Sequence, residues 1–123
     1  MPVQYAQVGA FLLVAVDGDF TVAELGRVLE SAVKDGRVPD PARVLLDLSG
    51  AATLAHKTDG DLADCASLFA SPPGRFDPVA VLLQRDAVDD LLRLGAAFLG
   101  RVGLRAAPFR SREEAESWLL DPE

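Results

Sequence analysis

The chain has 123 residues, half of them hydrophobic and a quarter charged, which fits one globular domain over 1–123 and excludes a disordered or collagen-like chain. Twelve basic against nineteen acidic side chains give a net charge of −7, which disfavours binding to nucleic acid or to an anionic membrane surface. One cysteine and one histidine exclude an internal disulfide and a zinc site made of soft ligands.

The N-terminal part predicts a hairpin followed by a helix. Val3–Val8 alternates with a period of two, and the apolar run Ala10–Val16 is typical of a strand buried on both faces. Thr21 and Glu24 have the spacing of a capping box at the start of a helix. The apolar stripe expected to bury that helix consists of Val22, Leu25, Val28, Leu29, Ala32 and Val33.

Two further strand and helix pairs are predicted in the middle of the chain. Arg43–Leu48 is a second buried strand, and a helix begins at Thr58 with Leu62, Cys65, Ala66 and Phe69 at helical spacing. Val79–Leu83 is a third buried strand, followed by a helix that Asp86 caps. Cys65 lies on the apolar stripe of its helix, so we expect a buried, inert thiol.

The C-terminal part predicts a short strand over Leu104–Phe109 and a last helix capped by Ser111. Pro108 cannot donate to a sheet ladder, so this strand belongs at a sheet edge opposite the hairpin. The predicted order is ββαβαβαβα, with about four helices. It indicates an α/β domain with a mostly parallel sheet and one antiparallel strand.

Few residues offer a pattern for catalysis. Asp17, Asp19 and Asp47 lie at the ends of predicted strands and are the only set that could converge on a magnesium ion. The favoured explanation is structural: Asp17 and Asp19 form a turn, and Asp47 ends a strand. His56 is the sole histidine and lies in a polar connection, with no nucleophile elbow, P-loop or dinucleotide-binding glycine motif elsewhere. We therefore expect no enzyme activity, no cofactor and no metal.

The hairpin, the tract Val44–Gly50 (VLLDLSG) and the closing tract Phe109–Leu119 (FRSREEAESWL) resemble the STAS-like domain family, the bacterial relatives of sporulation anti-sigma factor antagonists. The resemblance implies a five-stranded mixed sheet with helices chiefly on one face, and a non-enzymatic module that binds other molecules. In the classical antagonists a serine before the second helix is phosphorylated. The matching tract here, Ala55–Thr58, has no serine, and Thr58 is the nearest hydroxyl.

The favoured hypothesis is a cytoplasmic regulatory or interaction module that binds a protein partner without the classical phospho-serine switch. The polar segment 51–61 is the predicted contact surface, with Thr58 as a candidate phosphorylation site and helix N-cap. Its partner-binding candidates are Thr53, His56, Lys57, Thr58 and Asp61.

Three alternatives stay open. A pocket beneath the second helix would carry a small apolar or nucleotide ligand and be lined by Leu54, Leu62, Phe69 and Phe76. A receiver-like phosphoacceptor would use Asp47. A homodimer would form through Val3–Val8, because unpaired edge strands invite pairing. The longest apolar run is too short to span a membrane.

Overall fold

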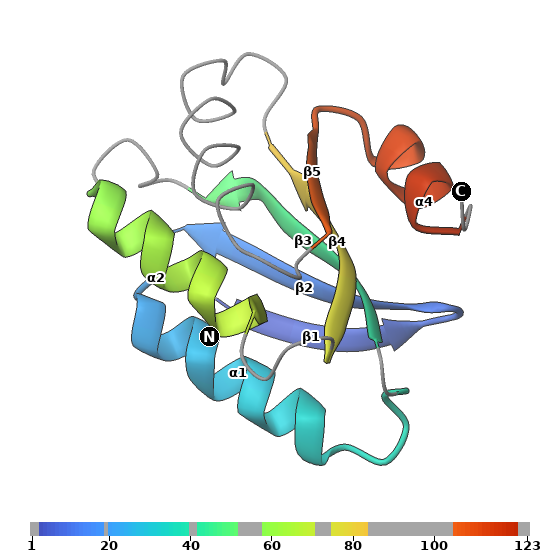
Figure 1. Cartoon of the computed structure of the whole chain (residues 1–123), viewed down its shortest axis with the longest axis horizontal. Helices are drawn as coiled ribbons and strands as arrows, with labels where there is room; N and C mark the ends of the chain where they lie inside the picture. Colours follow the sequence, from blue (N-terminus) through green and yellow to red (C-terminus); the bar gives the residue numbers. More distant parts are fainter. Residues whose placement is uncertain are drawn as a thin grey trace.

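The chain folds around a five-stranded sheet (Figure 1). The computed structural model describes residues 3–18, 20–39, 42–51, 58–70, 75–83 and 105–120. Their elements are β1 (Val3–Val8), β2 (Phe11–Gly18), α1 (Val22–Lys34), β3 (Ala42–Ala51), α2 (Asp59–Ala70), β4 (Phe76–Leu82), β5 (Ala106–Phe109) and α4 (Arg112–Leu120). The predicted helix after Asp86 lies outside the described residues, which contain three helices.

The strands follow one another across the sheet in chain order, β1-β2-β3-β4-β5. β1 is antiparallel to β2, and each of the other neighbouring pairs is parallel. The predicted α/β class, the mixed and mostly parallel sheet and the two predicted edge strands are thereby confirmed. β3 is longer than predicted, because its pairing with β2 continues past an irregularity as far as Ala51 opposite Gly18.

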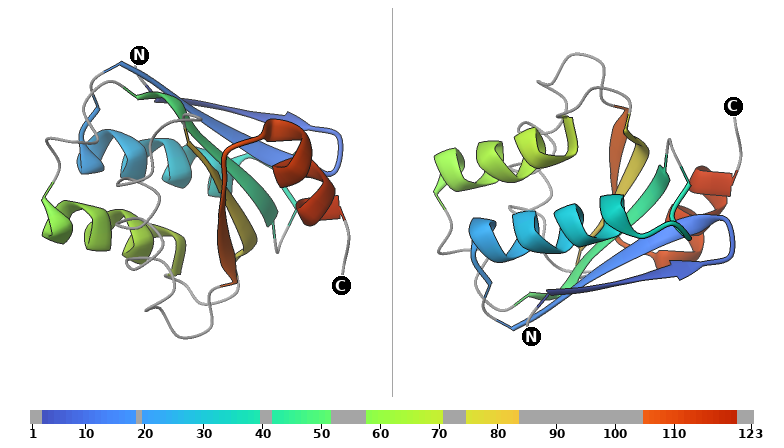
Figure 2. Two further views of the ribbon diagram at one scale, coloured as in Figure 1. Left: turned by 90° about the horizontal axis from the view of Figure 1, so that it is seen from above. Right: turned by 90° about the horizontal axis from the view of Figure 1, so that it is seen from below.

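Helices cover both faces of the sheet (Figure 2). α1 and α2 lie on one face, as expected when successive right-handed crossovers step in the same direction across a sheet. α4 follows the last strand and packs on the opposite face against β3, β4 and β5. Buried side chains therefore form two cores, one on each side of the central strands.

The central strands are buried on both faces, which explains their uninterrupted apolar sequences. Val44 and Leu46 of β3 face the α1 and α2 side, whereas Leu45 between them belongs to the core under α4. On α1 the predicted stripe is correct for Leu25, Val28, Leu29 and Ala32 and wrong for Val33, which is 43% exposed. α1 thus presents a large apolar side chain to solvent near its C-terminal end.

Local hydrogen bonds define the helix starts that the sequence predicts. The Thr21 hydroxyl accepts from the backbone N–H of Glu24 at 3.1 Å, and the Glu24 carboxylate accepts from the backbone N–H of Thr21 at 3.0 Å. This reciprocal pair is the predicted capping box. None of the helices in the described ranges has the length and hydropathy needed to cross a bilayer.

Candidate functional site

The start of α2 carries the two predicted partner-binding residues that the structure describes. The Thr58 hydroxyl accepts from the Asp61 N–H at 3.0 Å, and the Asp61 carboxylate accepts from the Thr58 N–H at 3.2 Å. The predicted N-cap role of Thr58 is confirmed, and Asp61 makes the cap reciprocal. These two bonds hold the exposed Thr58 in place at the N-terminal end of α2. Thr53, His56 and Lys57 lie outside the described residues.

The predicted pocket residues are part of the packed core. Leu62, Phe69 and Phe76 are at most 2% exposed, and the rings of Phe69 and Phe76 meet edge to face with centroids 5.8 Å apart. Cys65 of α2 is also buried, as predicted. Leu54 lies outside the described residues. These side chains fill the space between α2 and the sheet with apolar contacts, and Phe76 also borders an open hollow.

That hollow is a groove of about 500 Å³ between α1 and α2. The two helices approach each other at Gly26, where an added Cβ would lie 3.5 Å from a terminal methyl of Leu68. The absent side chain of Gly26 therefore contributes to the open space. The lining residues are Ala23, Gly26, Arg27, Leu29, Glu30, Val33, Lys34, Leu68 and Phe76. Two features of the α1 sequence indicate this groove: a glycine inside the helix, and an apolar stripe that extends beyond the face the helix buries.

The groove combines an apolar floor with a charged rim. Leu29, Leu68 and Phe76 provide apolar surface. Arg27 and Lys34 stand on the α1 side two helical turns apart, about 10 Å along the axis, with the carboxylate of Glu30 between them in the sequence. Both cations are exposed, and neither forms an ion pair with another described residue. The α1 wall therefore offers two cations and one carboxylate to a bound group.

The strand-end carboxylates that the structure describes, Asp17 and Asp47, lie on the paired strands β2 and β3. The half-buried Asp47 accepts hydrogen bonds from both the backbone N–H and the hydroxyl of Ser49, which closes a local turn. Asp17 is exposed and lies over Gly50, further along the pair of strands. Asp19 lies outside the described residues. Across the described ranges no three His, Cys, Asp or Glu side chains gather where they could hold a metal ion.

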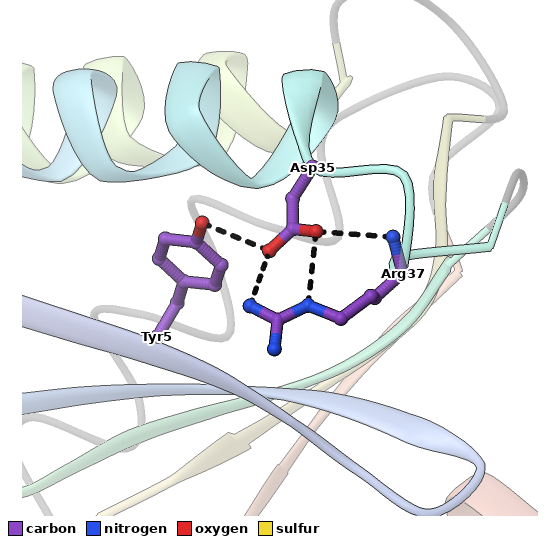
Figure 3. Close-up of polar contacts among 3 residues, drawn as sticks. All are labelled: Tyr5, Asp35 and Arg37. Atoms are coloured by element: carbon purple, nitrogen blue, oxygen red, sulfur yellow. Dashed lines mark hydrogen bonds and ion pairs between the residues drawn. The ribbon is translucent and has the colours of Figure 1, made fainter.

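A polar cluster that the sequence analysis missed joins β1 to the end of α1 (Figure 3). The Tyr5 hydroxyl donates to Asp35 at 3.2 Å, and Arg37 donates its Nε and Nη2 to the two carboxylate oxygens at 3.2 and 3.0 Å. The backbone N–H of Arg37 adds a bond of 3.0 Å. Tyr5 and Asp35 are 30 positions apart, whereas Asp35 and Arg37 belong to one turn. No periodic sequence pattern therefore indicates this cluster.

The cluster shifts the pKa of each member. Hydrogen bonds from the Arg37 side chain and backbone lower the pKa of Asp35 to about 2, against its desolvation, which acts in the opposite direction. Desolvation and the bond to Asp35 raise the pKa of Tyr5. The hydrogen bond to Asp35 raises the pKa of Arg37, whose side chain is 85% exposed beside a hollow of about 550 Å³. Because Asp35 already compensates this cation, the cluster is a structural link between strand and helix.

In comparisons with protein-family models, with curated proteins and with solved structures, this chain matched none.

Proposed function

We propose that this chain is a non-enzymatic, STAS-like interaction module that binds a protein partner on its α1 and α2 layer. The groove between the two helices carries the proposal, because it joins an exposed apolar side chain and an apolar floor to a charged rim of Arg27, Glu30 and Lys34. Exposed apolar surface with a polar rim is typical of protein interaction sites. The sequential strand order supports the STAS-like architecture.

The predicted surface at the start of α2 belongs to the same layer. Thr58 and Leu68 are ten residues apart on one helix, about 15 Å along its axis. A standard interface buries about 800 Å² on each partner, which is large enough to cover both places. The proposed contact surface therefore runs from the polar start of α2 to the groove beside its end.

A pair of matched positions tests the proposal. Val33 on α1 and Leu120 on α4 are 43% and 48% exposed, and they lie on opposite faces of the sheet. A photo-crosslinking amino acid placed at 33 should join the chain to one partner protein in the cells that produce it, and the same group placed at 120 should not. No adduct at 33, or the same adduct from both positions, would reject the α1 and α2 layer as the contact surface.

A small apolar ligand is a second candidate, because the groove is within the size range of ligand pockets and Phe76 borders it. Native mass spectrometry of the purified chain should then show a small added mass. A Val33→Arg change, which places a charge in the groove, should remove that mass, whereas Leu120→Arg should leave it. A chain without any added mass would dismiss this candidate.

We propose further that the chain is cytoplasmic and that it works without the classical phospho-serine switch. Thr58 is exposed at a helix start, where a phosphate would be favoured by the helix dipole. Phosphate analysis of the chain isolated from its own cells, with Thr58→Asn as the control, decides whether this hydroxyl is modified. Asn keeps the cap and removes the hydroxyl.

A further inference from the structure

β1 is an edge strand without the features that usually prevent strands from pairing. Its six residues, VQYAQV, include no charged residue and no proline. The opposite edge, β5, is only four residues long, contains Pro108, and is flanked by Arg105 and Arg110. Short length, proline and charge protect edges against strand addition. Of the two sheet edges in the described part of the chain, β1 is therefore the one whose sequence suits the addition of another strand.

The turn after β1 decides which of its backbone groups face outward. Gly9 has a φ of 57°, and Ala10 has no positive φ, which is the pattern of a two-residue type II′ hairpin turn. In such a turn Val8 and Phe11 are hydrogen-bonded to each other. Since bonding alternates along an antiparallel ladder, the backbone groups of Val3, Tyr5 and Gln7 point away from β2.

These outward groups fix the register that a second β1 would adopt. In an antiparallel pair related by a two-fold axis through the sheet, an axis at Tyr5 sets Tyr5 opposite its own copy and Val3 opposite Gln7. All three outward residues then bond. An axis at Ala6 would instead leave Val3 opposite Gly9, outside the strand. The axis at Tyr5 therefore gives hydrogen-bond partners to more of the outward backbone groups of β1.

The absence of charged residues in β1 suits a second copy as the occupant of this edge. Two copies of a chain with a net charge of −7 repel each other, and an uncharged strand is where they can approach with least repulsion. The exposed side chains Gln4, Ala6 and Val8 lie on the sheet face that carries α4, whose contacts are with β3, β4 and β5. With the axis at Tyr5, Gln4 lies opposite Ala6 of the second copy, so no like charges meet on that face of the strand pair. Beside the strand, Arg37 lines a hollow with Tyr5, Ala6 and Gln7, and its ion pair with Asp35 compensates its charge.

We propose that β1 pairs antiparallel with β1 of a second copy about a two-fold axis at Tyr5, which joins the two sheets into one. This homodimer uses the hairpin edge and leaves the groove between α1 and α2 open, so it is independent of the proposed function.

Two double variants test both the edge and the register. In Gln4→Lys with Ala6→Lys, lysines of the two copies face each other at both symmetric pairs. In Gln4→Lys with Ala6→Glu, each lysine faces a glutamate. Because both positions are exposed, we expect both variants to fold, which circular dichroism and thermal unfolding verify. The dimer dissociation constant from sedimentation equilibrium should be about tenfold or more weaker for the lysine pair than for the mixed pair.

The lysine pair also lowers the net negative charge of the chain, which by itself would favour association, so weaker binding cannot be a general charge effect. Hydrogen exchange gives a second readout: the amides of Tyr5 and Gln7 should become protected as the protein concentration rises. A wild-type chain that stays monomeric at all concentrations overturns the proposal. Equal dissociation constants for the two double variants, whether weak or tight, overturn it as well.

Discussion

The hydroxyl of Tyr5 lies 3.2 Å from the carboxylate of Asp35 and donates a hydrogen bond to it. The two residues are 30 positions apart, one on the edge strand β1 and the other at the C-cap of α1. This bond, together with the pairing of Asp35 with Arg37, attaches the outer strand of the sheet to the end of the first helix (Figure 3).

Tyr5 is the only tyrosine of the chain, so its ionisation can be followed directly by ultraviolet absorbance. Desolvation and the bond to Asp35 raise its pKa above the ordinary value of 10.0. We expect the titration midpoint of the folded protein to lie above that value. In Asp35→Asn the midpoint should fall back toward it, because the neighbouring negative charge is gone. An unchanged midpoint in the variant would show that the carboxylate does not act on Tyr5.

The lowered pKa of Asp35 predicts that the folded chain loses stability in acid. Its pKa is about 2 in the folded chain against an ordinary 3.8, so folding favours the ionised form. The stabilisation is fully present above about pH 4 and is lost as the pH falls toward 2. Urea unfolding of the wild type and of Asp35→Asn should therefore give a stability difference that shrinks across this window. A difference that stays constant from neutral pH down to 2 would contradict the depressed pKa.

Thr58 predicts a cost in stability when its cap is lost. Thr58→Ala should lower the free energy of unfolding by about 1 kcal/mol, because the N–H of Asp61 loses its acceptor. Thr58→Ser and Thr58→Asn keep a capping oxygen and should stay close to the wild type. Chemical unfolding of the three variants checks this order. Equal losses for Ala and Asn would mean that the hydroxyl acts through something other than the cap.

Gly26 predicts a gain in stability when alanine replaces it. Glycine costs a helix interior up to about 1 kcal/mol relative to alanine, and the added Cβ would meet Leu68 at an ordinary contact distance of 3.5 Å. Gly26→Ala should raise the thermal midpoint, whereas the larger Gly26→Leu should lower it by forcing α1 and α2 apart. A destabilised alanine variant would show that the two helices are closer than this structure has them.

Short-range patterns predicted most of the fold. The Thr21 and Thr58 caps involve residues three positions apart, and the buried strands show as apolar runs, so both are visible in one stretch of sequence. The Tyr5 and Asp35 bond depends on how α1 lies on the sheet, which no local pattern specifies. Val33 is exposed for the same kind of reason, since α1 and α2 meet at Gly26 and leave the end of the stripe uncovered.

The candidate site was predicted less completely than the fold. Thr58 was correctly identified as a cap, but Leu62 and Phe69 are core residues with 2% and 0% exposure. Helical spacing alone cannot distinguish a side chain that lines a pocket from one that fills it. The groove arises from the packing of two helices that are separate in the sequence, so it becomes visible only in the folded chain.

Native mass spectrometry of the chain, isolated gently from the cells that produce it, tests the central claim most directly. The account predicts a complex of the chain with one partner protein that is lost in Val33→Asp and kept in Leu120→Asp, its equally exposed control on the other face. A complex that survives in both variants, or a chain that carries only a small molecule, would contradict a protein-binding surface on α1 and α2.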